Sequence, residues 1–176
     1  LPESFDLRSE GLVSSVKNQG NYGTCWAHSA AASMETSLIA QNPFIDISEW
    51  QLAYFGTVSS HEFDYSYGSA AADSSSDTDF YKLFEMGGSQ SMIINSITHW
   101  GGISDEEKFP YGFEGIANED YRYASDYHVS DIYRSVENLT ASENVNSQVK
   151  ELVYDGISVT LSFLSYDGFY NSETGA

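Results

Sequence analysis

The amino-acid sequence predicts an α+β protein with a helical first lobe and a second lobe rich in strands. Apolar residues recur at helical spacings over 24–40 and 90–100, in the first part of the chain. Further along, residues 127–133 and 157–163 alternate between apolar and polar side chains, which is typical of half-buried strands. With 176 residues, 41% of them hydrophobic, the chain is long enough to bury a core in one domain of two lobes.

Three features organise the first part of the chain. The first predicted helix covers residues 24–40, with Thr24 as its candidate N-cap. A second, short helix begins at the capping-box pattern Ser48–Gln51 and continues to Phe55. Residues 56–86 are rich in Ser, Asp, Gly and Tyr, so we predict a long acidic surface loop or insertion there. The core residues predicted for the first helix are Ala27, Ala30, Ala31, Met34, Leu38 and Ile39.

A third helix is predicted over 90–100, and the glycine pair that begins at Gly101 ends it. A second capping-box pattern begins at Ser104, and a turn follows at Phe109–Tyr111. The core residues predicted for the third helix are Met92, Ile93, Ile97 and Trp100.

The second part of the chain mixes the two predicted strands with one helix over 144–154, which Gly156 ends. We assign residues 1–112 to the helical lobe and residues 113–176 to the first, incomplete part of the strand-rich lobe.

The charge balance excludes several classes of partner. The chain carries 26 acidic and 7 basic side chains, a net charge of −19, so its surface repels nucleic acid and anionic membranes. A solvated acidic surface explains this charge, and attraction of cationic peptides is the alternative. No apolar run approaches membrane-spanning length, so we expect no membrane insertion.

No metal or cofactor is expected, because the sequence has no zinc-ligand spacing, phosphate-binding loop or basic patch. Asp73, Asp77 and Asp79 are candidate calcium ligands. Their spacing is not that of an EF-hand, however, and runs of Asp and Ser are usually plain loops.

Cys25 is the only cysteine of the chain, so it forms no internal disulfide. It follows Gly23 and Thr24 and begins an alanine-rich helical pattern. Free N–H groups and the positive end of the helix dipole at such a position favour the thiolate form. The thiolate is the nucleophile of cysteine hydrolases, so this pattern predicts one. The alternative is a small buried hydrophobic residue, the usual role of a free cysteine.

Several motifs lie within the first 30 residues. They are Pro-x-x-x-Asp-x-Arg from Pro2, Val-Lys-Asn-Gln-Gly from Val16, and Gln19 followed six residues later by Cys-Trp-Ala. Together they resemble the mature N-terminus of papain-family cysteine proteases. The resemblance implies the papain fold, which has a helical lobe and a β-rich lobe, and a peptidase activity. Tyr22 stands where plant and animal members usually have a disulfide-forming cysteine, a departure that resembles prokaryotic members.

The resemblance also implies roles for individual residues. Cys25 would be the nucleophile, and the Gln19 side-chain amide would join the Cys25 backbone N–H as an oxyanion hole. The backbone of Gly87 and Gly88 would pair with the substrate like an added strand, because a side chain there would block its approach. Taken alone, Gln19 and the two glycines are ordinary turn residues. The other residues implied to bind substrate or shape its loop are Ser89, Gln90, Thr160 and Gly23.

A histidine is missing where the resemblance requires one. Papain-like enzymes place the catalytic His and Asn about 130–150 residues after the cysteine, yet no His follows His128. We interpret the four histidines of the chain as structural or solvated: His28, His61, His99 and His128. We therefore predict the larger chain of a cleaved two-chain enzyme, whose second chain supplies the His and Asn. A truncated sequence is the alternative.

These observations predict an endopeptidase that hydrolyses peptide or protein substrates through a thioester acyl-enzyme. The rival function is a catalytically silent papain-like module that binds peptides or partners. The presence of both Gln19 and Cys25 favours the enzyme. The expected location is secreted or on the cell surface, as for many prokaryotic members of the family.

Overall fold

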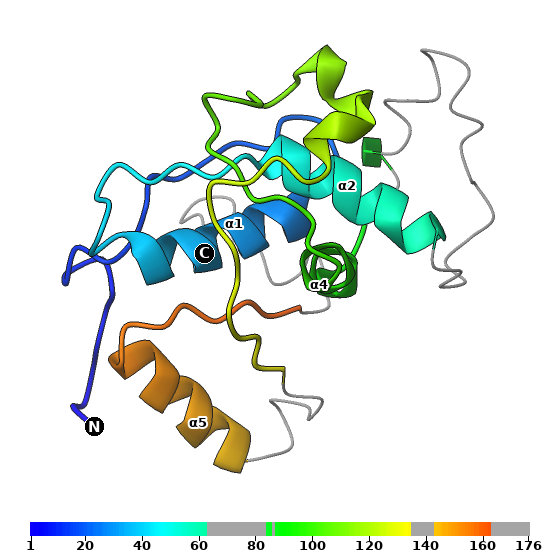
Figure 1. Cartoon of the computed structure of the whole chain (residues 1–176). Coiled ribbons are helices and arrows are strands. Elements are labelled where there is room, and N and C mark those ends of the chain that lie inside the picture. Colours follow the sequence, from blue (N-terminus) through cyan, green and yellow to red (C-terminus); the bar gives the residue numbers. More distant parts are fainter. Residues whose placement is uncertain (63–83, 86, 135–142, 163–176) are drawn as a thin grey trace.

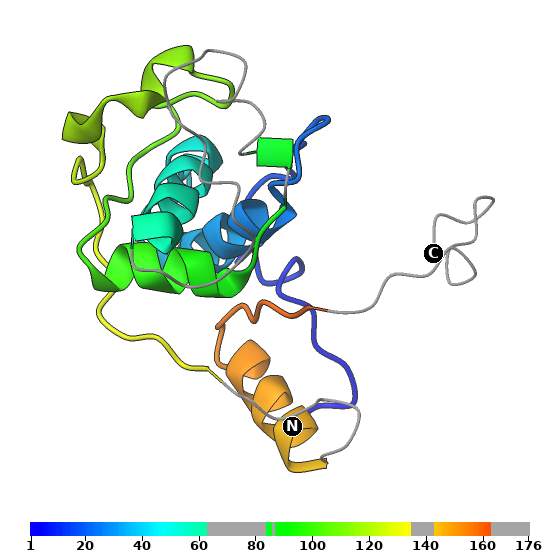
Figure 2. The same cartoon turned by 90° about the vertical axis from the view of Figure 1, so that its right-hand side faces the viewer.

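The computed structural model describes residues 1–62, 84–85, 87–134 and 143–162 of the chain. Within these ranges, α1, α2 and α4 pack against one another, and α5 lies on the other side of α1 (Figure 1). Figure 2 shows the N-terminal segment running down to α5, away from α2 and α4. The bounds of the helices are α1 (Cys25–Leu38), α2 (Glu49–Glu62), α4 (Gln90–Thr98) and α5 (Glu143–Tyr154), with the 3-10 turns η1 (Glu114–Ala117) and η2 (Glu119–Tyr121).

Large side chains fill the space between α1, α2 and α4. Trp50 of α2 is fully buried, and its ring stacks on that of Phe84 at a centroid distance of 3.9 Å. Trp26 of α1, Phe55 of α2 and Ile93 of α4 belong to the same buried cluster. Burial of each such side chain contributes roughly 1.5–3 kcal/mol, so this cluster holds the three helices together.

The prediction of the first helix is confirmed, because α1 covers Cys25–Leu38 and Thr24 precedes it as the N-cap residue. Ala27, Ala30 and Ala31 are buried as predicted. Their small side chains let neighbouring segments approach the backbone of α1 closely.

The second helix starts as predicted but is longer. The Ser48 hydroxyl accepts a hydrogen bond from Gln51 N–H at 3.0 Å, which caps α2. The helix continues past Phe55 to Glu62, so the first seven residues of the predicted 56–86 loop are helical. Gly56 lies within this helix, where a Cβ would lie 3.0 Å from Trp26 Cζ3, so the glycine lets Trp26 pack closely on α2. Residues 63–83 lie outside the described part.

The third predicted helix corresponds to α4, with Ile93 buried and Met92 and Ile97 packed against the core. Trp100 is not a core residue, and that prediction was wrong. It follows the end of α4 with φ +62° and is 69% exposed, and its ring contacts His128 at 5.0 Å. The helical spacing that placed it in the core no longer holds beyond Thr98. The capping-box pattern at Ser104 starts no helix either, because the Ser104 hydroxyl instead donates to the Ala124 carbonyl.

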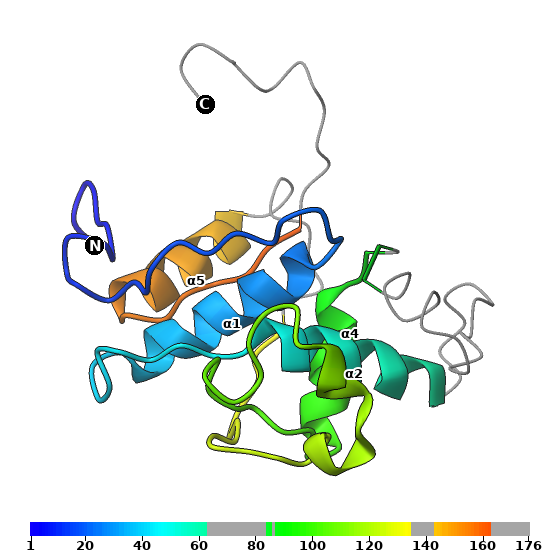
Figure 3. The ribbon, with the colours of Figure 1, turned by 90° about the horizontal axis from the view of Figure 1, so that it is seen from above.

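The predicted strands are not strands in the described part of the chain. At 127–133 the structure has only an isolated antiparallel bridge between Ile103 and Tyr127, and 157–162 has no ladder. Alternation indicates a half-buried segment, but a strand also needs a partner edge to pair with. Residues 157–162 run alongside α1 instead (Figure 3), where the Ser33 hydroxyl donates to the Ser158 carbonyl at 2.9 Å.

The predicted helix over 144–154 is confirmed as α5, and Gly156 follows it with φ +83°. The N-terminal segment packs on this helix, since the rings of Phe5 and Tyr154 meet edge to face at 5.1 Å. Phe113 and Ile116 pack against the helical core, although they follow the predicted lobe boundary at residue 112. Among the described residues, no helix is long and apolar enough to cross a membrane.

Candidate active site

Cys25 is the first residue of α1 and is exposed. The Thr24 side chain makes no capping hydrogen bond to the helix. The positive end of the α1 dipole at Cys25 is therefore not offset by a side-chain cap. Such a helix end stabilises negative charge placed beside it.

Gln19 lies in the loop that leads to Cys25. Its side-chain amide donates to the Tyr22 carbonyl at 2.6 Å, so the side chain is folded over its own loop. Gly20 turns the chain with φ +61°, a conformation that favours glycine. The Trp26 indole N–H donates back to the Gly23 carbonyl at 3.1 Å. One of these hydrogen bonds thus holds the loop internally, and the other joins it to the first turn of α1.

The structure brings Gly23 and Gly87 together. Gly23 N–H donates to the Phe84 carbonyl at 2.6 Å, and a Cβ on Gly23 would lie 2.8 Å from Gly87 N. Gly87 itself has φ +72° and open space around its Cα. Glycine is thus required at 23 by close approach and favoured at 87 by backbone conformation.

Gly88 is exposed and lies on the indole of Trp26. A Cβ there would be 2.4 Å from Trp26 Cε2 and 2.8 Å from Met92 Sδ, so the fold itself requires glycine at this position. Ser89 precedes α4 in an extended conformation. The Gln90 amide donates to the Trp26 carbonyl at 3.2 Å, which ties the start of α4 to α1.

Thr160 lies on a different segment from these residues. It is half-buried within 157–162, the segment that the Ser33 hydroxyl ties to α1. The predicted substrate-binding residues therefore divide into one group around Gly23, Gly87 and Gln90 and a separate Thr160.

The histidines whose side chains the structure describes have other partners. His28 Nδ1 lies 3.1 Å from the Thr24 carbonyl oxygen, and His99 Nδ1 lies 2.7 Å from the Asn95 carbonyl oxygen. His128 is exposed and contacts Trp100. These contacts agree with the interpretation of these three as structural or solvated, while the side chain of His61 lies outside the description.

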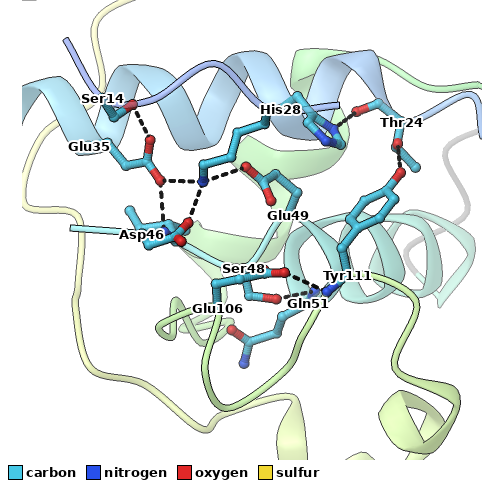
Figure 4. Close-up of polar contacts among 12 residues, drawn as sticks. Ser14, Thr24, His28, Glu35, Asp46, Ser48, Glu49, Gln51, Glu106 and Tyr111 are labelled. Atoms are coloured by element: carbon cyan, nitrogen blue, oxygen red, sulfur yellow. Dashed lines mark hydrogen bonds and ion pairs between the residues drawn. The ribbon is translucent and has the colours of Figure 1, made fainter. Parts of the chain in front are cut away.

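Sequence reasoning missed the importance of Tyr111, which it named only as part of a turn. Its hydroxyl donates to the Gln19 carbonyl at 2.9 Å and also pairs with the Thr24 hydroxyl, so it contacts both ends of the loop before Cys25. Figure 4 shows the contact with Thr24. Burial raises the pKa of Tyr111, so the hydroxyl keeps its proton for donation. The only local signal in the sequence was the rigid turn at Pro110.

A buried ionic cluster holds the segment that leads into this loop. The Lys17 ammonium lies 3.1 Å from carboxylate oxygens of both Glu35 and Glu49 and also contacts Asp46 (Figure 4). Burial alone would lower the pKa of Lys17, but the hydrogen bond to Asp46 and the charges of Glu49 and Glu35 outweigh it, so the pKa is raised. Lys17 therefore stays charged and links its segment to α1 and α2.

Glu106 is the other perturbed carboxyl near the site. Burial raises its pKa to about 7, and the Tyr111 backbone N–H that donates to its Oε1 at 2.5 Å opposes this. Its Oε2 atom is buried without a hydrogen-bond partner. The carboxyl with this raised pKa accepts the hydrogen bond that holds the Tyr111 backbone.

In the described part of the chain, no cluster of three or more His, Cys, Asp or Glu side chains is placed to hold a metal ion. The weak calcium candidates Asp73, Asp77 and Asp79 lie outside the described residues.

Comparison with known proteins relates the chain to cysteine proteinases. Residues 1–71 match the family model described as papain family cysteine protease. The chain is 32% identical over 170 residues to zingipain-2 of Zingiber officinale, which covers 95% of this chain and 63% of that protein. It is 34% identical over 115 residues to cysteine proteinase 1 of Dictyostelium discoideum, covering 65% of this chain and 30% of that protein.

A third relative is the low-temperature-induced cysteine proteinase of Solanum lycopersicum, 28% identical over 162 residues, with 92% of this chain and 39% of that protein covered. The chain thus spans less than two thirds of the length of these relatives. The matched residues 1–71 contain both Gln19 and Cys25.

Proposed function

We propose that this chain is the part of a papain-family cysteine peptidase that carries the nucleophile. The observation that carries the proposal is the exposed Cys25 at the N-terminus of α1, behind a loop that contains Gln19. The similarity to cysteine proteinases over most of the chain supports it. The papain-like two-lobe fold, with a β-rich second lobe, belongs to the same proposal.

In the proposed reaction, the Cys25 sulfur gives its proton to an imidazole and attacks the carbonyl carbon of a peptide bond. The negative charge that develops on the carbonyl oxygen is stabilised by the Cys25 backbone N–H and the Gln19 amide. The C–N bond then breaks as the imidazolium protonates the leaving amine. Water hydrolyses the remaining thioester and releases the acid, which returns Cys25 to its thiol form.

The substrate would lie along the backbone of Gly87 and Gly88 as an added strand. Support comes from two observations. Gly87 contacts Gly23, which lies two residues before Cys25, and Gly88 is exposed and lies on Trp26, the residue after Cys25. Ser89, Gln90 and Thr160 are proposed to line the neighbouring pocket. The hydrogen bond of Gln90 to the Trp26 carbonyl gives this side chain a structural role as well.

The imidazole and its orienting Asn are proposed to lie outside these 176 residues, on a second chain produced by cleavage of a precursor. Support comes from the histidines, since His28, His99 and His128 are engaged elsewhere and none follows His128. A single longer polypeptide that carries the same His and Asn is the alternative. A secreted or surface-displayed protein of prokaryotic type is proposed with it, on the basis of Tyr22.

The test is intact mass measurement of the native protein, with and without an epoxide inhibitor of papain-like enzymes, and with Cys25→Ala as the control. We expect an epoxide adduct on Cys25, no adduct in the variant, and a second polypeptide. An adduct on a single longer chain would refute only the two-chain arrangement. An unmodified Cys25 would refute the peptidase and favour a silent module that binds peptides or partners.

A further inference from the structure

Tyr111 reaches the two ends of the loop before Cys25 from far away in the sequence. Its hydroxyl proton goes to the Gln19 carbonyl, with an oxygen–oxygen distance of 2.9 Å. Because a tyrosine hydroxyl has one proton, the Thr24 hydroxyl is then the donor in the second short hydrogen bond. One oxygen atom thus links the residue of the proposed oxyanion hole to the residue that precedes the nucleophile.

The ring of Tyr111 is packed between elements of the helical lobe. It meets the rings of Trp50 of α2 at 4.9 Å, His28 of α1 at 5.1 Å and Tyr22 of the loop at 6.2 Å, each close to edge to face. Aromatic pairs of this geometry contribute beyond the area that they bury. The hydroxyl is therefore held in place by a rigid ring rather than by a flexible side chain.

The backbone of Tyr111 is fixed as well. Its N–H donates to Glu106 Oε1 at 2.5 Å, and the turn closes with Phe113 N–H donating to the Pro110 carbonyl at 2.8 Å. Figure 4 shows Tyr111 extending from Glu106 at one end to Thr24 at the other. The backbone of Tyr111 and its ring contacts with Trp50 and His28 thus anchor this residue outside the loop that its hydroxyl contacts.

We propose that Tyr111 is a positioning residue, which sets the spacing between Gln19 and Cys25 through its hydroxyl. The proposal rests on the proposed peptidase function. Other long-range contacts of the Gln19–Thr24 loop are the hydrogen bond from the Gly23 N–H to the Phe84 carbonyl, the contact of Gly23 with Gly87, and the packing of the Tyr22 ring on Trp50 and Phe84. None of these contacts involves Gln19 or Thr24, the two residues that the Tyr111 hydroxyl joins. An oxyanion hole loses efficiency when its donors move by small distances, so the restraint acts on the rate of reaction.

The test is Tyr111→Phe in the native protein, which removes the hydroxyl and keeps the ring. Tyr127→Phe is the matched control. The Tyr127 hydroxyl donates to Asp105 at a distance of 2.9 Å, and neither residue belongs to the Gln19–Thr24 loop. For Tyr111→Phe we expect kcat to fall about 10- to 100-fold, with KM within about 2-fold of its original value. We also expect hydrogen exchange of the amides at 20–24 to rise about 10-fold, while the amides of α2 stay unchanged. The control should change neither quantity by more than about 2-fold.

Equal kcat and equal loop exchange in Tyr111→Phe and wild type would overturn the proposal. So would an equal loss in both variants, because that would reflect general stability. If the wild-type protein hydrolyses no peptide, the proposed function has failed. The loop exchange and the rate at which iodoacetamide alkylates Cys25 then decide whether Tyr111 positions the loop: a change in both supports it, and no change overturns it.

Discussion

At the scale of single residues, the candidate site depends on contacts that the local sequence pattern does not reveal. The residues beside Gln19 in the sequence indicate only a turn. In the structure, its side-chain amide donates to the Tyr22 carbonyl, and its own carbonyl accepts a hydrogen bond from the Tyr111 hydroxyl. Gly88 is a glycine because Trp26 lies against it. Each of these contacts fixes the position of the backbone around Cys25 rather than contributing a reactive group.

Gln19→Ala tests the oxyanion donor. We expect kcat to fall about 100-fold with little change in KM, because one oxyanion donor contributes roughly a hundredfold or more in rate. The measurement is steady-state hydrolysis of a fluorogenic peptide. Asn21→Ala in the same loop is the control, since Asn21 is exposed and is expected to leave kcat unchanged. A rise in KM with kcat unchanged for Gln19→Ala would contradict the assigned role.

Glu106→Gln tests the raised pKa of this carboxyl. The folded protein binds the Glu106 proton more tightly than the unfolded chain does, since burial raises the pKa from 4.5 to about 7. The stabilisation that the folded protein gains from binding this proton more tightly is complete below pH about 4.5. It is lost as pH rises to about 7, so the free energy of unfolding falls across this window. With allowance for solvent screening of a half-exposed group, the loss is about 1 kcal/mol.

Glutamine keeps the acceptor for Tyr111 N–H but does not ionise. We therefore expect Glu106→Gln to gain stability relative to wild type between pH 5 and pH 8, as measured by urea unfolding at both values. Parallel stability curves for the two proteins would show that Glu106 is ionised throughout.

At the scale of elements, the helical lobe is joined by one buried ionic cluster as well as by its apolar core. The segment that contains Lys17 has no regular structure, but its ammonium group meets Glu35 of α1 and Glu49 of α2, whose side chains are only 2% and 3% exposed. Glu35 Oε1 also accepts the Ile47 N–H at 2.8 Å. The cluster therefore links α1, α2 and the approach to the Gln19 loop.

Lys17→Met is expected to destabilise the protein strongly, by about 3–5 kcal/mol, because it leaves two buried carboxylates without a counterion. Chemical denaturation at pH 7 measures the change. Lys17→Met combined with Glu35→Gln and Glu49→Gln is the matched comparison, and it should recover part of the loss because the buried charge is removed. A loss below 1 kcal/mol for Lys17→Met would mean that the cluster is solvated in solution.

At the scale of the whole molecule, the dominant property is the net charge of −19. Such a charge acts at a distance and is screened by salt, with a Debye length of about 10 Å at 0.1 M ionic strength. It does not depend on the details of the fold, and it acts on any charged substrate of the proposed peptidase.

We expect kcat/KM for a peptide rich in Lys and Arg to fall several-fold between about 20 mM and 500 mM NaCl. A matched peptide with Leu in place of the basic residues should change by less than about 2-fold. Fluorogenic hydrolysis assays across the salt series measure both. The same salt response for both peptides would leave the acidic surface with a role in solvation alone.

By itself, the sequence predicted three of the helices and a candidate site. The helices at Cys25–Leu38, Gln90–Thr98 and Glu143–Tyr154 were predictable, because the apolar spacing and the residues that start or end a helix are local features of the sequence. The Gln19–Cys25 motif was readable for the same reason, and residues 1–71 match the family that it resembles.

The tertiary structure alone decided the features that depend on distant partners. Trp26 packs on Gly56 inside α2, residues 157–162 lie along α1 rather than in a strand ladder, and Tyr111 bridges Gln19 and Thr24. Periodicity reports which face of a segment is buried, but it does not report which element covers that face. A contact between residues some ninety positions apart is set by the packing of the whole lobe, so no local pattern contains it.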